Sequence, residues 1–313
     1  MESELIDYLR QRLPPHPCLR LGAGDDAAVL SLGDAADAVV TVDMLMDGVD
    51  FRLEEVDPLR VGRKSLAVNL SDLAAMAVEP VAAVVAVALP KRGGMALAKA
   101  LYEGILPLAA EFDVAIAGGD TNSWDGPLVV SITAIGRTPT SADGSPTYWR
   151  RSGARPGDVL VATGEFGGSI LGKHLDFTPR VREARLLGEQ YDIRAAIDVS
   201  DGLAIDLGRM LAESGCGARL DLASVPISRA AEELAHRSAD GSSPLDHALG
   251  DGEDFELLLA VEANTAAKLI AEQPLGVPLT VIGQFVAEQG LWQRDAAGAI
   301  SPLAPRGFLH EFD

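Results

Sequence analysis

Hydrophobic and polar positions along the first half of the chain change period several times. Continuous apolar runs rich in β-branched residues are typical of buried strands, whereas longer stretches with apolar residues three or four positions apart are typical of helices. The pattern predicts, in chain order, a helix over residues 2–13, a strand over 38–42, a helix over 58–78, a strand over 81–89, a helix over 95–112, and strands over 114–117 and 128–136. Pro58 and Pro80 bound the second of these helices. We expect a mixed α/β or α+β unit.

The pattern breaks after this unit and then restarts. Residues 138–150, TPTSADGSPTYWR, are rich in Thr, Ser, Pro and Gly, which is typical of a linker between domains. We therefore expect an N-terminal domain over residues 1–137 and a C-terminal domain over 151–313. In the C-terminal domain the pattern predicts strands over 158–162, 195–199, 256–261 and 279–282, and a helix over 203–213.

Composition narrows the class of protein. The 313 residues carry a formal net charge of −20, with 48 % hydrophobic and 5 % aromatic residues. This hydrophobic content is too high for a disordered chain, and the negative charge and scarce aromatic residues argue against a nucleic-acid binder. The two cysteines are too few for a disulfide framework or a multi-cysteine metal site. Because the acidic start is unlike a secretory signal and the longest apolar run, 78–89, is too short to span a bilayer, we expect a cytoplasmic protein without a membrane partner.

Acidic residues gather at the ends of the predicted strands, in glycine-rich turns. Loops beyond strand ends are where α/β proteins bind ligands, and Mg²⁺ binds carboxylates together with substrate phosphates. The alternative is that each Asp hydrogen-bonds its own turn, but five such motifs together favour a metal site. The acids are Asp25, Asp26, Asp43, Asp47, Asp50, Asp120, Asp198, Asp201, Asp251, Glu253 and Asp254.

Asp72 is a different signal, because it lies within a predicted helix that is otherwise mostly apolar. Ser65, Asn69 and Asp72 fall at i, i+4 and i+7, which places three polar side chains on one face of that helix. A buried carboxylate must be paired or coordinate a metal ion. Asp72 is therefore either a metal ligand, which we favour, or a hydrogen-bonding cap for a neighbouring element.

Several familiar catalytic patterns are missing from the sequence. It contains neither a GxxxxGK[ST] loop nor a GxGxxG turn between a strand and a helix. The glycine-rich residues 161–172 are expected to form a connecting loop rather than a phosphate cradle. The five histidines lie outside the acidic motifs and are expected on the surface, which argues against a nucleophilic triad.

Taken in order, seven motifs resemble the thiamine-monophosphate kinase family. They are GDDAAVL, TVDMLMDGVDF, KSLAVNLSDLAAM, AGGDT, WRRSGARPGD, AIDVSDGL and GEDFELL. The resemblance implies a two-domain aminoimidazole ribonucleotide synthetase-like fold, with an N-terminal domain that binds ATP and Mg²⁺ and a C-terminal α/β domain. It also implies a homodimer that converts thiamine monophosphate to thiamine diphosphate, with ATP as the phosphoryl donor and several Mg²⁺ ions.

The functional positions of the family transfer to individual residues of this sequence. As Mg²⁺ ligands the resemblance implies Asp26, Thr41, Val42, Asp43, Asp72, Asp120, Asp198 and Asp201. For ATP it implies Gly119, Asp120, Arg151 and Ser200, and for thiamine monophosphate Asp50, Glu253 and Phe308. We expect Asp120, Arg151 and Asp198 to act in catalysis by placing and neutralising charge, because a phosphate acceptor is already ionised near neutral pH and needs little help from a base.

Three positions depart from the pattern of the family. Asp50 stands where histidine is frequent, Val42 where a hydroxyl residue is frequent, and Phe308 where tyrosine or tryptophan is usual.

Two alternatives to the kinase therefore stay open. One is another ATP-dependent enzyme of the superfamily, such as a selenophosphate or aminoimidazole ribonucleotide synthetase, and the other is a non-catalytic nucleotide-binding dimer. Direct in-line transfer of the γ-phosphoryl group to thiamine monophosphate is the function we expect.

Overall fold

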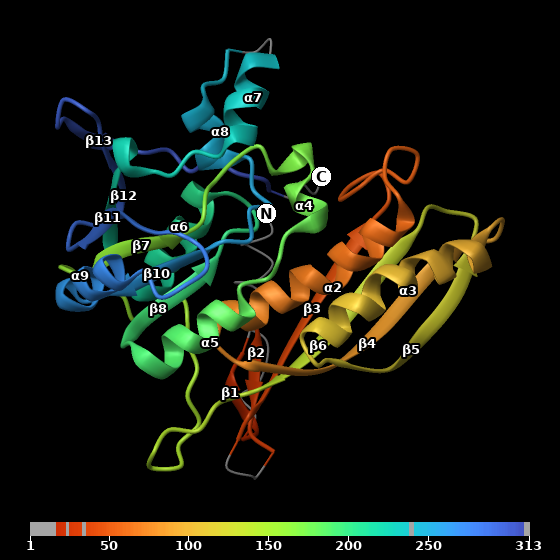
Figure 1. Ribbon diagram of the computed structural model, residues 1–313. Helices are drawn as coiled ribbons and strands as arrows, with labels where there is room; N and C mark the ends of the chain where they lie inside the picture. The colour runs from red at the N-terminus through yellow and green to blue at the C-terminus, as the bar shows by residue number, and fades with distance from the viewer. Residues whose placement is uncertain (1–16, 23–24, 33–35, 238–240, 310–313) are drawn as a thin grey trace.

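The computed structural model describes residues 17–22, 25–32, 36–237 and 241–309 of the chain. Two lobes, each built around its own β-sheet, lie side by side (Figure 1). The predicted helix over residues 2–13 lies outside the described residues. In the described part, no helix is both long enough and apolar enough to cross a lipid bilayer.

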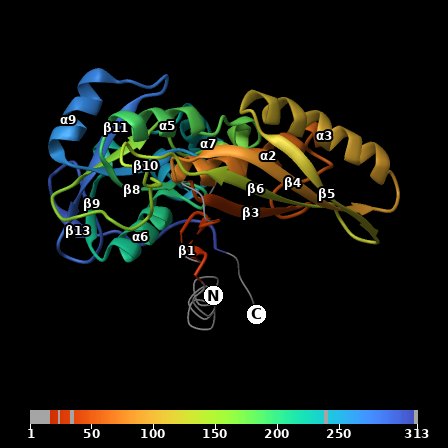
Figure 2. The ribbon, with the colours of Figure 1, turned by 90° about the horizontal axis from the view of Figure 1, so that it is seen from below.

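The first sheet has six strands, and two long helices cover one of its faces. The strand order is β1-β2-β3-β6-β4-β5, antiparallel except for the parallel pair β4 and β5. Helices α2 (Pro58–Ala75) and α3 (Gly94–Glu111) pack together on one side of this sheet, as Figure 2 shows. The strands are β1 (Leu19–Leu21), β2 (Ala28–Leu30), β3 (Ala38–Met46), β4 (Glu79–Pro90), β5 (Ala115–Trp124) and β6 (Val129–Arg137).

The other face of this sheet is not covered by any described residue (Figure 2). The register places Val42, Thr133, Val84 and Gly118 in one row across β3, β6, β4 and β5. Val42 is 61 % exposed and Val84 36 % exposed. Since a sheet that faces water normally presents polar side chains, the apolar row has the character of a surface that another molecule covers.

The second sheet has seven strands in the order β13-β12-β9-β11-β7-β10-β8. Its strands are β7 (Val159–Thr163), β8 (Ile193–Asp198), β9 (Gly217–Asp221), β10 (Leu257–Val261), β11 (Leu279–Val286), β12 (Gly290–Arg294) and β13 (Ile300–Pro302). The helices of this lobe are α4 (Lys173–Asp176), α5 (Val181–Gln190), α6 (Leu203–Ser214), α7 (Arg229–Arg237), α8 (Pro244–Gly250) and α9 (Ala263–Glu272), with 3-10 turns at η1 (Ser169–Leu171) and η2 (Leu222–Ser224). Strand β10 is buried along its whole length, which explains its continuous apolar run.

Helix α2 joins the two lobes. It packs against α3 in the first lobe and against α4, α5 and β8 in the second. Asp57 caps its N-terminus, where Asp57 Oδ1 accepts a hydrogen bond from the Leu59 amide at 2.9 Å. The contact with α3 needs glycine, because a Cβ on Gly104 would lie 1.8 Å from the Leu59 carbonyl oxygen. Side chains on α2 are thereby fixed relative to both lobes.

The strands and helices predicted within the described residues are present, but several bounds were wrong. Helix α2 ends at Ala75 rather than at residue 78, and β11 continues to Val286 rather than ending at residue 282. Strand β3 continues to Met46 and β5 to Trp124, because both remain paired along their length with β6 and β4 respectively. Asp43 and Asp120 therefore lie inside strands, not beyond their ends. Elements that the sequence pattern missed are β1, β2, β9, β12, β13, α4, α5, α7, α8 and α9.

Candidate active site

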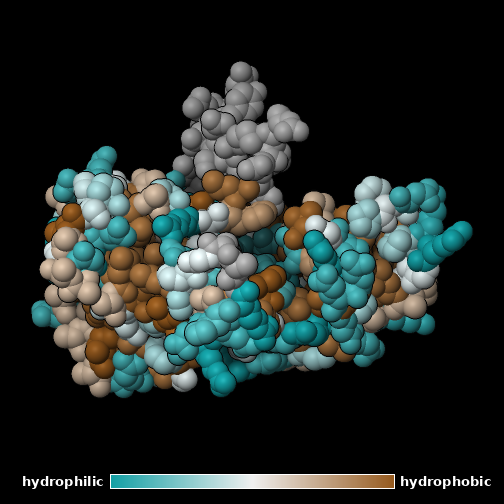
Figure 3. Space-filling model, turned by 90° about the horizontal axis from the view of Figure 1, so that it is seen from above, coloured by the Kyte–Doolittle hydropathy of each residue, from teal (hydrophilic) through white to brown (hydrophobic). Residues whose placement is uncertain are grey.

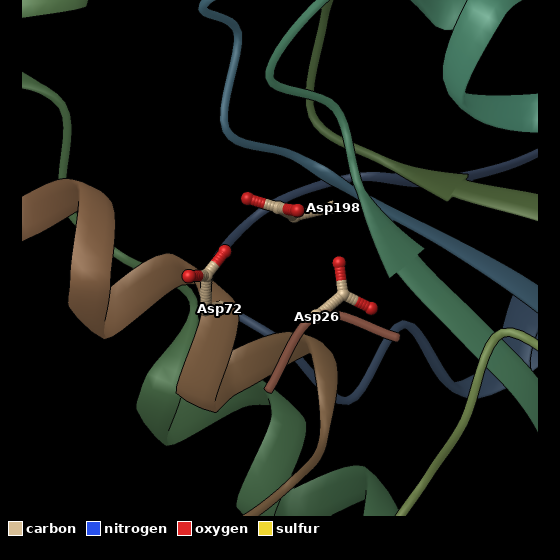
Figure 4. A group of neighbouring side chains, drawn as sticks. All are labelled: Asp26, Asp72 and Asp198. Atoms are coloured by element: carbon tan, nitrogen blue, oxygen red, sulfur yellow. The ribbon is translucent and has the colours of Figure 1, made fainter. Parts of the chain in front are cut away.

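Three carboxylates from distant parts of the chain meet between the lobes. Asp26 comes from the loop before β2, Asp72 from the last turn of α2 and Asp198 from the end of β8. One oxygen of each lies within 4.8 Å of the others, and the three side chains face a common space (Figure 4). Carboxylate oxygens at this spacing are a suitable ligand set for a hard divalent cation.

Hydroxyl groups hold two of these carboxylates in place. Ser71 Oγ donates a hydrogen bond to Asp198 Oδ2 at 2.5 Å, and Thr41 Oγ1 donates to Asp72 Oδ2. Thr41 was among the residues predicted from the sequence, but Ser71 was not. The available signal for Ser71 was its position beside Asp72 on a helix whose other side chains are mostly apolar. Through Ser71, helix α2 also fixes a carboxylate of the second lobe.

A cationic side chain, that of Arg151, faces the cluster. Arg151 Nη2 lies 2.7 Å from Asp26 Oδ1, and the Arg151 amide donates a hydrogen bond to Asp25 Oδ1 at 3.2 Å. Burial opposes the charged form of Arg151, but Asp26 and Asp25 outweigh it and raise the pKa of the guanidinium. Arg151 is therefore a permanent positive charge at the edge of the carboxylate cluster.

The carboxylates of the cluster repel one another at short range. Burial is the main cause that raises the pKa of Asp72 well above its ordinary value, and the charges of Asp43, Asp198 and Asp26 add to it. Burial likewise raises the pKa of Asp198, with the charge of Asp26 as the next cause. Burial raises the pKa of Asp43 to about 6. A bound divalent cation would relieve both effects, because it supplies the counter-charge that these groups lack.

Unpartnered oxygens point to the same conclusion. Among the described residues, Asp26 Oδ2 and Asp43 Oδ2 are buried and have no hydrogen-bond partner. A buried acceptor without a donor is costly unless something else coordinates it. The oxygens, the all-carboxylate donor set and the mutual repulsion fit Mg²⁺, and Asp26, Asp43, Asp72 and Asp198 are the residues that could hold it.

A cavity of about 340 Å³ adjoins the cluster through Asp43, which lines it. The three residues implied for the substrate, Asp50, Glu253 and Phe308, all line this cavity, although they lie far apart in the sequence. Figure 3 shows a hollow between the two lobes with hydrophilic surface inside it. The cavity combines carboxylates with apolar walls such as Val49, so it suits an organic ligand that carries positive charge.

Asp201 and Ser200 lie at the second-lobe side of this cavity. Asp201 Oδ2 is paired with Arg209, which also lies 2.7 Å from Asp206 Oδ1. Asp206 Oδ2 in turn accepts a hydrogen bond from the Asp201 amide at 2.9 Å. Burial raises the pKa of Asp206 to about 7. Asp201 is thus held away from the three-carboxylate cluster by its own network, and its role as a metal ligand stays a prediction.

Gly119 and Asp120 do not join the cluster within the single chain. Both lie exposed on the edge strand β5, and Asp120 shares a row with Met44, Ser131 and Ala86 on the uncovered face of the sheet. A Cβ on Gly119 would lie 1.8 Å from the Val85 carbonyl oxygen, so glycine is required there for close strand packing. The predicted contacts of this strand with ATP and Mg²⁺ stay predictions.

Val42 is on the same uncovered face as Asp120, since its neighbours Thr41 and Asp43 point to the opposite side of β3. Its side chain is 61 % exposed and apolar, so only its backbone carbonyl is chemically suited to a metal ion. Its predicted role as a ligand stays a prediction.

The expectation that the histidines lie on the surface was wrong for two of them. His174 and His247 are buried, and each has a polar partner for its ring. His174 Nδ1 lies 2.8 Å from Ser169 O, and His247 Nδ1 lies 2.9 Å from Asp251 Oδ1.

Of the three polar side chains on one face of α2, Asp72 is the one that lies in the carboxylate cluster. Ser65 and Asn69 hydrogen-bond to carbonyl groups of their own helix.

Within residues 161–172, a connecting loop over 164–168 is present as expected, whereas 161–163 belong to β7 and 169–171 form η1. The amides of Gly167 and Gly168 are already used, since they donate to Asp254 Oδ1 at 2.9 Å and to Asp251 Oδ2 at 2.8 Å. These hydrogen bonds fix the loop to the segment that carries Glu253. No phosphate cradle is needed to explain its glycines.

Two family models match the chain along most of its length. The description "AIR synthase related protein, N-terminal domain" matches residues 24–138, and "AIR synthase related protein, C-terminal domain" matches residues 155–292. Among curated relatives, the thiamine-monophosphate kinase of Rhodopirellula baltica is 44 % identical over 99 % of this chain and 97 % of its own. That of Escherichia coli K12 is 35 % identical over 86 % of this chain and 85 % of its own.

Solved structures resemble the whole chain in the same way. The thiamine-monophosphate kinase of Stenotrophomonas maltophilia K279a is 35 % identical, with a TM-score of 0.71 over 92 % of this chain and 95 % of that chain. A structure described as AaThiL complexed with AMPPCP and TMP gives a TM-score of 0.81 over 98 % and 96 %, at 23 % identity. E. coli HypE, a hydrogenase maturation protein, gives 0.72 over 98 % and 99 % at 20 % identity. At such low identities the last two likenesses concern the fold alone.

Proposed function

The chain belongs to the thiamine-monophosphate kinase family of the AIR synthase related proteins, and from that membership we propose its reaction, its ligands and the residues that act. It phosphorylates thiamine monophosphate to thiamine diphosphate with ATP as the donor. The observation in the structure that carries this proposal is the meeting of Asp26, Asp72 and Asp198 beside Arg151 and next to the cavity.

In the reaction, an oxygen of the thiamine monophosphate phosphate attacks the γ-phosphorus of ATP. The bond between that phosphorus and the β–γ bridging oxygen breaks, so the products are thiamine diphosphate and ADP. Two anions must be brought together in line, and charge must be neutralised as the phosphoryl group moves. Arg151 supplies a fixed positive charge for this, and its contact with Asp26 sets its position.

Mg²⁺ held by Asp26, Asp43, Asp72 and Asp198 would neutralise charge on the phosphoryl oxygens. The unpartnered oxygens of Asp26 and Asp43 and the raised pKa values of Asp72 and Asp198 support this assignment. The expectation that several ions bind comes from the family resemblance alone. Asp201 and Thr41 are assigned to the same role on that basis.

The acceptor cavity suits the chemistry of thiamine monophosphate. Val49 and Phe308 offer apolar contact to its rings, and the carboxylates of Asp50 and Glu253 offer negative charge to its positive thiazolium ring. Asp50 Oδ2 accepts a hydrogen bond from the Met46 amide at 2.7 Å, so this carboxylate also closes its own turn. An aspartate in place of the histidine usual in the family is compatible with a role toward the cationic part of the substrate.

We also assign a homodimer formed through the uncovered face of the first sheet. Val42 and Val84 in one row of this face and Met44 in a neighbouring row are apolar and exposed, and Asp120 lies on the same face. A partner subunit seated there would cover the apolar side chains. It would also bring Asp120 of one subunit toward the other, which accounts for a predicted ligand that stands apart from the cluster in one chain. The cytoplasm remains the expected location.

The test is product formation by the purified protein with ATP, Mg²⁺ and thiamine monophosphate, with thiamine diphosphate separated by chromatography. We expect thiamine diphosphate from thiamine monophosphate, none from free thiamine, and none after a chelator removes the metal. ATP binding without turnover on any phosphorylated acceptor would instead favour the non-catalytic dimer.

A further inference from the structure

We propose that Lys64 is a positioning residue for the phosphoryl acceptor, because it hydrogen-bonds to both loops that form the acceptor cavity. The acceptor is thiamine monophosphate, the substrate in the proposed function, and this inference rests on that function. The geometry that suggests it is independent of any substrate.

Lys64 lies on α2, and its side chain is completely buried. Its Nζ donates a hydrogen bond to Glu253 Oε1 at 2.5 Å and another to the Asp50 carbonyl oxygen at 2.9 Å. Glu253 and Asp50 both line the cavity, Glu253 from the second lobe and Asp50 from the first. One ammonium group therefore fixes both sides of the cavity at once.

Stability alone is a poor explanation for this ion pair. Removing a lysine from water is costly, and a buried ion pair commonly contributes less than well-packed apolar side chains of similar volume. Helix α2 already has an exposed ion pair to the second lobe, Arg60 Nη2 to Asp176 Oδ2 at 2.5 Å. A buried charge that bonds to two cavity residues is better explained by what it does to the cavity.

Glu253 is held in an unusual conformation. Its φ is +53°, in the left-handed region that residues other than glycine rarely adopt, and its amide donates to the Ser200 carbonyl oxygen at 2.6 Å. Glu253 Oε1 accepts the hydrogen bond from Lys64, while Glu253 Oε2 accepts no hydrogen bond from any described residue. One carboxylate oxygen is therefore fixed, and the other is left for a donor group or positive charge on the acceptor.

The charge of the cavity lining also supports a positioning role for Lys64. Asp43, Asp50, Asp201 and Asp251 also line the cavity, so an uncompensated Glu253 carboxylate would be repelled by these neighbours and displaced from its position. Lys64 compensates Glu253 from behind the cavity wall without contacting the acceptor, because its side chain is not exposed. Loss of Lys64 should therefore weaken acceptor binding through Glu253.

The test compares Lys64→Met, Lys64→Arg and the matched control Arg60→Met, which removes the exposed ion pair of the same helix. In Lys64→Met we expect KM for thiamine monophosphate to rise on the order of 10- to 100-fold, the cost of a lost charged hydrogen bond. We expect KM for ATP to change by less than about twofold, because Lys64 has no contact with the carboxylate cluster. Lys64→Arg should restore part of the loss, and Arg60→Met should leave both KM values unchanged.

A double variant tests whether Lys64 acts through Glu253. Adding Glu253→Gln to Lys64→Met should raise KM for thiamine monophosphate by less than about twofold further, because the two residues act as one unit. Independent, multiplying effects would overturn the proposal. So would an unchanged acceptor KM in Lys64→Met, or equal losses for ATP and the acceptor.

Hydrogen exchange separates this inference from the proposed function, since it needs no substrate. Amides of residues 252–255 should exchange faster in Lys64→Met than in wild type or in Arg60→Met. Unchanged exchange in a folded Lys64→Met protein would overturn the positioning role. A wild-type protein that makes no thiamine diphosphate would overturn the proposed function, while faster exchange would still support Lys64 as the residue that fixes the loop.

Discussion

Asp254 and Glu256 are two buried acids only two positions apart, and their environments shift their pKa values in opposite directions. Burial raises the pKa of Asp254 to about 8. Glu256 is equally buried, but Arg180 and Lys173 outweigh burial and lower its pKa; Arg180 lies 2.6 Å from Glu256 Oε1. The difference is the presence of counter-charges, which residue type alone does not reveal.

The raised pKa of Asp254 predicts a pH dependence of stability. The folded state binds the proton more tightly than the unfolded state, so the contribution of Asp254 is complete at pH values below about 4 and is lost as pH rises toward about 8. The loss amounts to at most about 1.4 kcal/mol per pH unit within this window. Asp254→Asn, which resembles the protonated acid, should flatten the dependence measured by denaturant unfolding from pH 5 to 9.

Glu256→Gln is the matched control for this measurement. Because Arg180 and Lys173 stabilise the Glu256 carboxylate, the amide should lower the free energy of unfolding at pH 7 by roughly 3–5 kcal/mol, the cost of breaking a buried ion pair. A pH profile of Asp254→Asn that is parallel to wild type would contradict the assignment of a protonated Asp254.

Asp72→Asn tests the metal site at the level of one residue. The substitution removes a charged ligand and one source of repulsion, so turnover should fall at least about 100-fold while the metal-free protein stays as stable as wild type or gains stability. The measurement is kcat together with the melting temperature with and without Mg²⁺. Full activity, or an unchanged Mg²⁺-dependent rise in melting temperature, would count against Asp72 as a ligand.

Sequence motifs were sufficient to name Asp26, Asp72 and Asp198, which the structure brings together. They were not sufficient for Ser71 and Lys64. Each of these acts through a partner more than 100 residues away in the chain, Asp198 for Ser71 and Glu253 for Lys64. A lone lysine or serine on a helix gives no indication of such a partner before the lobes are packed.

At the scale of elements, the crossing of α2 and α3 depends on glycines. Gly62 and Gly104 each face the backbone of the other helix, where an added Cβ would lie 2.0 Å from Leu101 O and 1.8 Å from Leu59 O. Backbone cannot move aside as the end of a side chain can. The close crossing in turn sets the position of α2, which carries Asp72 and Lys64.

Gly104→Ala should therefore be strongly destabilising despite the better helix propensity of alanine. We expect a loss of roughly 2–4 kcal/mol in the free energy of unfolding, because the helices must separate. The control is Gly208→Ala in α6, where nothing lies within 4 Å of the added Cβ. That change should stabilise the protein by roughly 0.5–1 kcal/mol. Equal effects of the two substitutions in denaturant unfolding would contradict the crossing described here.

Long elements were predicted better than short ones. Helices α2 and α3 and strands β4 and β6 have enough apolar residues in sequence to reveal their type, whereas the short strand β10 was recognised from its continuous apolar run. Short elements of the second lobe, such as α8 and β13, have too few positions for a period to emerge, and tertiary pairing decides them. The same pairing extended β3 and β5 through acidic and glycine-rich residues that suggested loops.

At the scale of the molecule, the uncovered face of the first sheet exposes apolar side chains to solvent. Val42 and Met44 are 61 % and 60 % exposed there. Exposed apolar rows of this kind mark association surfaces. The homodimer proposed above would bury these side chains. With Asp120 acting across the interface, the site would be complete only in the dimer.

Val84→Lys should separate the subunits. Val84 lies in the middle of the row, so a charge there would be buried without a partner in the dimer but solvated in the single chain. Light scattering should report a dimer for wild type and a monomer with reduced kinase activity for the variant. Val281→Lys, at a position 38 % exposed in the second lobe, should remain a dimer. A wild-type monomer at working concentrations would refute the shared site.

Short motifs of Asp and Gly, taken in order along the chain, were enough to assign the family and to name the acids of the central cluster, because such motifs carry local chemistry. The sequence also predicts two domains. The tertiary structure alone decided which of those acids meet. It placed Asp26, Asp72 and Asp198 around one point, left Asp120 on the uncovered face, and joined Lys64 to Glu253 across the lobes. The physical reason is that contact, burial and charge compensation depend on distances between residues far apart in the chain, which only packing fixes.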